Sequence, residues 1–177
     1  MNRFSASVIQ PTSRVHLGRI FFQRVSELGE RTFLKVQRLG GFEDISWRDF
    51  GAMGAKHPIR SACVPINKAD NVAIVSDNSL PRLCADLARL AGGLPNVVIA
   101  PTVSDRTLLK ILTHSRCRVV FIDLVAAHRV LALKSQLPNL SHVIVLKGGA
   151  EELARTISFA ELLEQGRRCQ RLRSDIG

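Results

Sequence analysis

Short apolar segments alternate with amphipathic helical patterns from residue 71 onward, and this alternation constrains the fold more than any other feature. The apolar segments have no polar face, which is typical of strands in a parallel sheet that helices cover on both sides. Because successive parallel strands are joined by right-handed crossovers, the alternation predicts an α/β fold with a mostly parallel, doubly wound sheet. Four strands are predicted: Val72–Val75, Val97–Ile99, Val119–Ile122 and Val143–Leu146.

The helical segments of this region carry their own start and stop signals. The clearest helix follows Asn78 and Ser79, which can cap it, and has Pro81 in its first turn. Its apolar residues share one face, its charged residues share the other, and Gly92-Gly93 ends it. Further helices are predicted at 104–114, at 124–137 and, after the capping box Ser158–Glu161, up to Gly166.

An amphipathic helix and a hairpin precede the alternating region. Apolar residues recur at helical spacing over residues 15–28, and Gly29 is a natural stop. Beyond it, two short segments flank Gly40-Gly41, a dipeptide that tolerates the positive φ angles of a tight reversal. These features predict an amino-terminal helix followed by a β-hairpin with strands at 32–36 and 42–46.

The segment after the hairpin has weaker helical character. Ser46–Asp49 resembles a capping box with Asp in place of the usual Glu, so a helix is predicted to start at Trp47. Its continuation is poor because Gly51, Gly54 and Pro58 interrupt it. The chain is therefore divided into a flexible lead-in at 1–14, an α/β unit at 15–166 and a basic tail at 167–177.

The net charge of +10 does not by itself indicate a nucleic-acid partner. Nucleic-acid-binding surfaces gather basic residues on one element with aromatic residues between them, whereas here the basic excess is spread along the chain. The arginine-rich run at 167–173 is interpreted as a solvated tail. The absence of Tyr and the single Trp leave little material for stacking on bases, so we expect no nucleic-acid partner.

Cysteine spacing and hydropathy indicate where the protein resides. The four cysteines lie far apart without a CxxC pair, so they are interpreted as reduced thiols that bind no metal. No apolar run approaches the roughly 20 residues that span a bilayer, and residues 1–17 are too polar for the apolar core of a signal peptide. These observations predict a cytoplasmic protein without a transmembrane segment.

Polar residues at the carboxyl ends of the predicted strands are the places to look for a site, because open α/β sheets bind ligands there. Asp77 and Asp123 occupy such ends and could act as catalytic carboxylates, although Asp77 is equally explained as part of a helix cap. Lys147-Gly148-Gly149 could approach a phosphate, with a surface turn as the alternative. His114 and Cys117 could be neighbours, but nothing supplies a third catalytic group.

Known site motifs are missing from the sequence. It contains no GxGxxG, no GxxxxGK[ST] and no GxSxG segment. The residues alone therefore assign no catalytic, cofactor-binding or metal-binding residue. The histidines are interpreted as surface or boundary residues: His16, His57, His114, His128 and His142.

Several segments nevertheless occur in an order that is typical of one enzyme family. They are Ile45–Phe50, Lys68–Asn78, Ala85–Gly93, Ile99–Thr102, Ile111–Asp123, Leu140–Val145 and Thr156–Gly166. In this order they resemble the amino-terminal part of an AMP-forming acyl-CoA synthetase, in the adenylate-forming group that includes long-chain fatty-acid CoA ligases and luciferase. The chain departs from the family at Ala69, where a Gly normally precedes the Asp, and over residues 53–65, where members have a regular helix.

The resemblance implies a two-step reaction in which a carboxylate attacks ATP to give an acyl-adenylate and pyrophosphate, and CoA then displaces AMP. It implies ATP, Mg and CoA as cofactors of a full-length member and a fatty acid as its substrate. The family's phosphate loop ending in Lys, its aromatic-Gly-x-Thr-Glu segment, its hinge carboxylate and its mobile catalytic Lys have no counterpart in this sequence. We therefore expect an amino-terminal fragment or truncated relative that binds no cofactor and is inactive alone.

A non-enzymatic α/β binding or interaction module is the alternative interpretation. A four-stranded sheet that is incomplete relative to the adenylate-forming domain would leave an unpaired edge strand. Such an edge, together with an uncovered apolar helix face, favours self-association. An exposed sheet edge is thus the predicted site of contact between copies of the chain.

Overall fold

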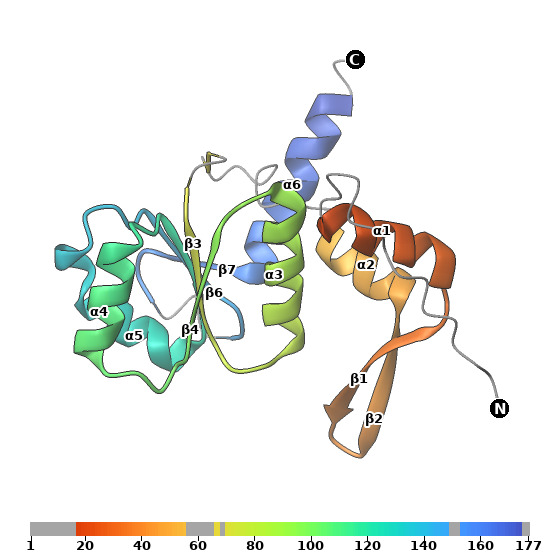
Figure 1. The fold of residues 1–177 in the computed structure, drawn as a ribbon, viewed down its shortest axis with the longest axis horizontal. Helices are drawn as coiled ribbons and strands as arrows, with labels where there is room; N and C mark the ends of the chain where they lie inside the picture. Colours follow the sequence, from red (N-terminus) through yellow and green to blue (C-terminus); the bar gives the residue numbers. More distant parts are fainter. Residues whose placement is uncertain (1–16, 56–65, 68–69, 149–152, 175–177) are drawn as a thin grey trace, which may run out of the picture.

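The computed structural model describes residues 17–55, 66–67, 70–148 and 153–174. An amino-terminal unit of two helices and a hairpin lies beside a larger unit built on a parallel sheet (Figure 1). This arrangement confirms the α/β fold class with an amino-terminal helix and hairpin. Positions 16, 57, 58, 63 and 69, and with them most of the segment that departs from the family, lie outside the described residues.

The amino-terminal unit is held together by a cluster of aromatic rings. Phe21, Phe33, Trp47 and Phe50 come from three elements, and the centroids of their rings lie 4.1 to 6.0 Å apart. Aromatic pairs at such distances add to the stabilisation that burial of their surface gives. The unit consists of α1 (Leu17–Leu28), β1 (Thr32–Arg38), β2 (Gly41–Ser46) and α2 (Trp47–Ala55), with β1 and β2 antiparallel.

Helix α2 starts where the sequence predicts and continues through its glycines. Ser46 Oγ accepts a hydrogen bond from the Asp49 backbone N–H at 3.0 Å and donates one to Asp49 Oδ2 at 2.7 Å, which caps the first turn. Gly51 is buried against α1, and a Cβ there would lie 2.9 Å from both Cγ atoms of Val25. The prediction that Gly51 and Gly54 interrupt the helix is wrong, because close packing on α1 offsets the ~1 kcal/mol that a helical glycine costs.

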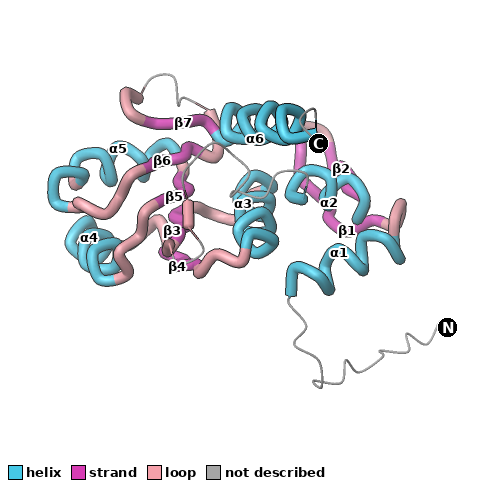
Figure 2. Tube along the Cα trace, turned by 90° about the horizontal axis from the view of Figure 1, so that it is seen from above, coloured by secondary structure: helices cyan, strands magenta, loops and turns pink. Residues whose placement is uncertain are grey.

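The larger unit is built on one parallel sheet with the strand order β4-β3-β5-β6-β7. Helices α3 and α6 cover one face and α4 and α5 cover the other, as expected for a doubly wound sheet (Figure 2). The elements are β3 (Val72–Val75), α3 (Leu80–Gly92), β4 (Asn96–Ile99), α4 (Asp105–His114), β5 (Val119–Ile122), α5 (Leu124–Ala132), β6 (His142–Val145), β7 (Thr156–Ser158) and α6 (Phe159–Ser174).

Alternate residues of the central strands contribute to two separate cores. Val72 and Ile74 of β3 belong to the core on the α3–α6 face, whereas Ala73 and Val75 belong to the core on the α4–α5 face. All four side chains are buried. Burial on both faces is the physical reason why β3 carries no polar residue.

The sheet has five strands, whereas the sequence predicted four. The additional strand, β7, pairs in parallel with β6 at one edge and has only three residues. Its side chains are half-buried, and a segment this short contains no readable period. At the other edge of the described sheet lies β4, which pairs in parallel with β3.

Two helices end elsewhere than predicted. Helix α6 continues to Ser174 and includes Gly166, because a single interior glycine costs only about 1 kcal/mol. The predicted boundary between the α/β unit and the basic tail therefore falls inside α6. Helix α5 ends at Ala132 and is followed by a 3-10 turn, since Leu137 precedes a proline and leaves the helical region with φ −119° and ψ 70°.

The ends of α3 match the predicted caps. Ser79 Oγ accepts a hydrogen bond from the Arg82 backbone N–H at 3.4 Å, and Gly93 closes the helix in the left-handed region with φ 66°. Across the described ranges, none of the helices combines the length and the apolar character that crossing a bilayer requires.

Candidate functional site

The carboxyl ends of β3 and β5 form the point where the sheet changes direction. The chain passes from β3 outward to β4 and then returns to place β5 on the other side of β3. The helices that follow the two strands lie on opposite faces, so the loops after β3 and β5 diverge. Ligands of open α/β sheets bind at such a position, which makes it the candidate site.

A hydrogen-bonded brace joins the two diverging loops. Ser76 Oγ lies 2.9 Å from Asp123 Oδ1, and the Asp77 backbone N–H donates to Asp123 Oδ2 at 3.1 Å. Ser76 is 6% exposed, and its single hydroxyl hydrogen is shared between Asp123 and the Asp77 carbonyl oxygen, also at 2.9 Å. Both carboxylate oxygens of Asp123 therefore have donors, and this side chain holds the loops together.

The second predicted carboxylate, Asp77, is exposed at the mouth of the same site. It does not cap α3, because the capping side chain is that of Ser79. Asn78 adds a further contact to the first turn by accepting a hydrogen bond from the Arg82 guanidinium at 2.7 Å. The structure thus brings Asp77 and Asp123 together, but through a backbone N–H and not through paired carboxylates.

The described residues at this edge do not fit the phosphates of a nucleotide. A phosphate site needs converging backbone N–H groups and cations, whereas Asp77 and Asp123 place two carboxylates here. Lys147 and Gly148 are exposed beyond β6, and Gly148 has φ 51° with open space where a Cβ would be. The third residue of that segment lies outside the described part of the chain. No catalytic step through a nucleotide is assigned to these residues.

The loop after β4 is fixed by a side chain that sequence reasoning missed. The Arg129 guanidinium of α5 donates hydrogen bonds to the carbonyl oxygens of Pro101 and Val103 and to the Asp105 carboxylate. These contacts occupy backbone acceptors at the carboxyl end of β4. No local sequence pattern indicates these contacts, because Arg129 is remote in the sequence from all three partners.

His114 and Cys117 do not form a catalytic pair. Cys117 is buried with its Sγ 3.1 Å from Ser115 Oγ, whereas His114 is exposed on α4. Burial raises the pKa of the Cys117 thiol, so this group stays protonated and weakly nucleophilic at neutral pH. The described residues include no group of three His, Cys, Asp or Glu side chains that could hold a metal ion.

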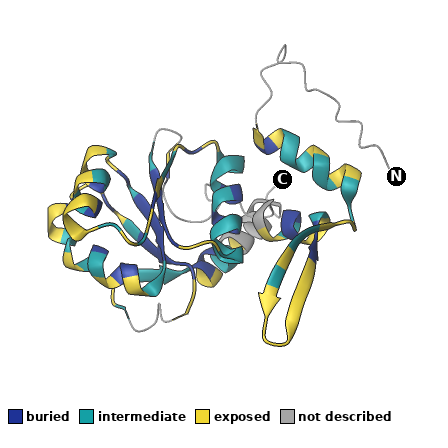
Figure 3. Ribbon diagram, turned by 60° about the horizontal axis from the view of Figure 1, so that its bottom comes forward, coloured by how far each residue is buried: buried dark blue, intermediate teal, exposed yellow. Residues whose placement is uncertain are grey.

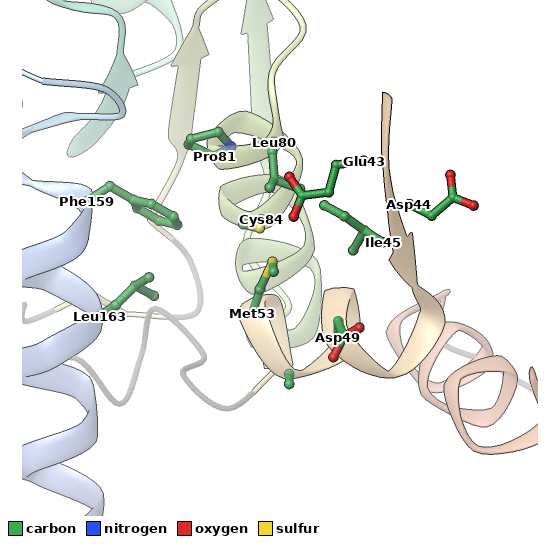
Figure 4. Close-up of a pocket in the computed structure, with 11 residues that line it drawn as sticks. Glu43, Asp44, Ile45, Asp49, Met53, Leu80, Pro81, Cys84, Phe159 and Leu163 are labelled. Carbon is green, nitrogen blue, oxygen red and sulfur yellow. The ribbon is translucent and has the colours of Figure 1, made fainter. Parts of the chain in front are cut away.

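A second hollow lies on the α3–α6 face of the sheet. A groove of about 660 Å³, which we call the α2–α6 groove, is bounded by β2, α2, α3 and α6 (Figure 4). Its volume is typical of ligand and docking sites. The apolar side chains that line it are Ile45, Ala52, Met53, Leu80, Pro81, Phe159 and Leu163, together with the thiol of Cys84.

The charged residues of the groove are carboxylates at its rim. Glu43 points toward the apolar lining and Asp49 lies at the start of α2, whereas Asp44 points away from the groove (Figure 4). Burial raises the pKa of the Cys84 thiol to about 11, so the lining carries no thiolate at neutral pH. Sequence reasoning missed this groove because its residues come from four elements that are distant in the chain.

Comparison with known proteins places the chain in a family. The family model described as "AMP-binding enzyme" matches residues 63–172. The fold is similar to the anthranilate CoA ligase AuaEII in complex with anthranoyl-AMP, with a TM-score of 0.71 and 14% identity. It is also similar to the luciferase-like enzyme of the mealworm Zophobas morio, with a TM-score of 0.73 and 20% identity. A third similar structure is that of a putative long-chain-fatty-acid CoA ligase from Rhodopseudomonas palustris, with a TM-score of 0.71 and 17% identity.

These structures are much longer than this chain. The match to the anthranilate CoA ligase covers 85% of this chain and 27% of the ligase. The match to the luciferase-like enzyme covers 88% of this chain and 35% of that enzyme. The match to the long-chain-fatty-acid CoA ligase covers 84% of this chain and 36% of that chain. The chain thus spans about a third of the length of the proteins whose fold it shares. No curated protein sequence matches it. Because the family match extends over more than half of its residues, the chain belongs to the AMP-binding enzyme family.

Proposed function

We propose that this chain is the amino-terminal part of an AMP-forming acyl-CoA ligase of the long-chain fatty-acid type, and that it does not adenylate a carboxylate alone. In this role it supplies a sheet scaffold onto which the residues that bind ATP, Mg and CoA are added. The family match and the shared fold support the ligase assignment. The resemblance of the sequence to long-chain fatty-acid CoA ligases supports the substrate class.

The braced edge of the sheet is the observation that carries the inactivity of the chain alone. At the position where α/β enzymes bind ligands, Asp123 is committed to Ser76 and to the Asp77 backbone, and the edge presents two carboxyl side chains and no cation among these residues. Such an edge repels a triphosphate and offers it no cradle of backbone amides. Adenylation therefore needs groups from elsewhere in a complete ligase.

The test is the acid-dependent exchange of labelled pyrophosphate into ATP. Purified chain is assayed with short, medium and long straight-chain acids and with an aromatic acid, beside an active CoA ligase as positive control. We expect no exchange above the rate without acid. Exchange that depends on both the acid and Mg would contradict the inactivity of the chain alone.

The ligase assignment needs a separate measurement. Sequencing the transcript across the codon of Gly177 is expected to show a continuation that encodes a Ser/Thr/Gly-rich loop ending in Lys, in the same or another frame. The complete product is then expected to favour the long-chain acids in the exchange assay. A preference for the aromatic acid would contradict the substrate class while leaving the family membership intact.

A non-enzymatic interaction module is the second candidate function. The α2–α6 groove favours it, because a hollow of about 660 Å³ with an apolar lining is a typical docking surface. Tight, saturable binding of a partner by a chain that shows no exchange activity would favour this function over the ligase scaffold.

A further inference from the structure

We propose that two copies of this chain pair through α6, with the arginine-rich end of each α6 seated in the α2–α6 groove of the other copy. The proposal goes beyond the proposed function and does not depend on it. It concerns the chain by itself and rests on the shape and charge of the groove and on the length and sequence of α6.

The groove needs an occupant that is both apolar and basic. Its lining, with Met53, Leu80 and Leu163, is apolar and half exposed, so covering it removes hydrophobic surface from water. Its rim carries the carboxylates of Glu43 and Asp49 and no basic side chain among the described lining residues. Acyl chains with a carboxylate head and nucleotides have the wrong charge for such a rim.

The rim carboxylates can accept further hydrogen bonds. Glu43 pairs with Arg38 at 2.7 Å, but its side chain is 53% exposed, and surface ion pairs of this kind are weak. Asp49 is hydrogen-bonded to Ser46 through one oxygen and is exposed. A carboxylate offers about four acceptor positions, so each of these groups can bind an arginine without losing its present partner.

The end of α6 has the chemistry that the groove requires. The first turn of α6 is anchored in the core by Phe159 and Leu162, and the helix then extends past the sheet toward the carboxyl terminus (Figure 1). The sequence of residues 167–174, Arg-Arg-Cys-Gln-Arg-Leu-Arg-Ser, contains four arginines and no acidic residue. Among these arginines, the side chain of Arg168 is 74% exposed and pairs with Glu164 at 3.5 Å.

In a two-fold arrangement, the groove of each copy can hold the α6 end of the other copy. Phe159 and Leu163 of α6 line one wall of the groove, so a helix that lies in the groove lies alongside α6 itself. If the partner's α6 runs antiparallel to it, the basic half of each helix contacts the anchored half of the other. A helix of 16 residues is about 24 Å long, which is enough for both halves to take part. The contact is self-complementary, as in most dimers.

The net charge of +10 does not rule out this pairing. Charges that are more than about 8 Å apart are largely screened at physiological ionic strength, so the contacts at the groove decide the local energy. Using the groove twice also brings the buried surface toward the roughly 1,200 Å² or more that a specific interface needs. The edge of the sheet offers less surface for an interface, since β4 has only four residues and short edge strands resist pairing.

The test is the oligomeric state of the full chain, measured by sedimentation equilibrium over a range of concentrations. We expect a reversible dimer for the unmodified protein. The helix variant, Arg171→Glu/Arg173→Glu, leaves the Arg168–Glu164 pair in place. The groove variant, Arg38→Glu/Glu43→Arg, keeps an ion pair on the hairpin but reverses the charge at the rim. Each variant is expected to raise the dissociation constant at least about tenfold, because like charges then meet across the interface.

The decisive measurement is a mixture of the two variants. The helix variant exchanges two arginines of the α6 end for glutamates and keeps the acidic rim, whereas the groove variant keeps the arginines of α6 and reverses the charge at position 43 of the rim. In an equimolar mixture the opposite charges meet at both contacts, so we expect a mixed dimer with nearly the affinity of the unmodified protein. Circular dichroism of each variant establishes that it is folded.

A control on the sheet edge separates this interface from the edge contact that the sequence predicts. Val98 of β4 is 60% exposed, and Val98→Lys is expected to leave the dimer unchanged. A monomer at all concentrations, a dimer that Val98→Lys dissociates, or a mixture of variants that stays monomeric would each overturn the proposal.

Discussion

The two faces of the central sheet are covered in different ways. On the α4–α5 face, both covering helices are crossovers between strands of the sheet, and they have buried as well as exposed positions (Figure 3). The side chains of Leu108 and Val130 on this face are completely buried. On the other face, α3 and α6 are joined by an amino-terminal unit that comes from a distant part of the sequence, and the α2–α6 groove remains between them. Crossover helices alone thus close one face, whereas the other face combines the crossover helix α3 with non-local packing of the amino-terminal unit and stays open at the groove.

Leucine truncation on each face gives the largest expected effect. Leu108→Ala removes a side chain with 0% exposure from the closed face and is expected to cost about 2 to 5 kcal/mol, because the cavity that it leaves cannot collapse. Leu163→Ala removes the same atoms from the wall of the open groove and is expected to cost about 1 kcal/mol or less. Urea unfolding measures the loss of stability in both variants. Equal losses would contradict the difference between the faces.

The brace between the loops that lead to the two faces gives the next largest effect. Asp123→Asn keeps an acceptor for Ser76 but replaces the oxygen that accepts from the Asp77 N–H, and we expect a loss of about 1 to 2 kcal/mol in the free energy of unfolding. Asp77→Asn is the matched control, because its side chain is exposed. If both variants lose the same stability, the brace does not hold the faces together.

Packing within the amino-terminal unit should be sensitive to one methyl group. Gly51→Ala places a Cβ 2.9 Å from Val25, and we expect a net loss of about 1 kcal/mol after the gain in helix propensity. The double variant Val25→Ala/Gly51→Ala should recover part of this loss, since it removes the clash. Thermal unfolding of the three proteins checks the result. A stabilising Gly51→Ala would show that α1 and α2 are not closely packed in solution.

The smallest expected effect is a pH dependence at the amino end of β6. Burial, followed by the charges of Arg118 and Lys134, lowers the pKa of His142 below 6.5. The unfolded chain therefore binds more protons at this site, so stability should rise as the pH increases toward and through 6.5. Urea unfolding in small pH steps should show this slope, and His142→Gln should reduce it. An unchanged slope in that variant would assign the dependence to other groups.

Local signals in the sequence predicted most elements of the fold. The caps at Ser46 and Ser79 and the glycine stop at Gly93 act within a few residues, so they can be read without knowledge of the rest. Strand β7 was missed because three half-buried residues carry no period. The length of α5 was overestimated because the effect of the proline after Leu137 was not taken into account.

The candidate site was predicted in part. Asp77 and Asp123 were identified because strand ends in a parallel sheet meet at one edge, but their connection through Ser76 was not. The contacts of Arg129 with the loop after β4 and the α2–α6 groove left no signal, since their members are far apart in the chain. Proximity of that kind depends on how the helices pack on the sheet.

The sequence by itself determined the alternation of strands and helices, the hairpin and the order of segments that resembles the AMP-binding enzymes. These features follow from hydrophobic periodicity and from hydrogen bonds between near neighbours. Only the tertiary structure decided that Asp123 braces two loops, that Gly51 packs against Val25 and that the hairpin unit leaves a groove beside α6. The physical reason is that side-chain packing depends on distances between segments, which a pattern along the chain does not contain.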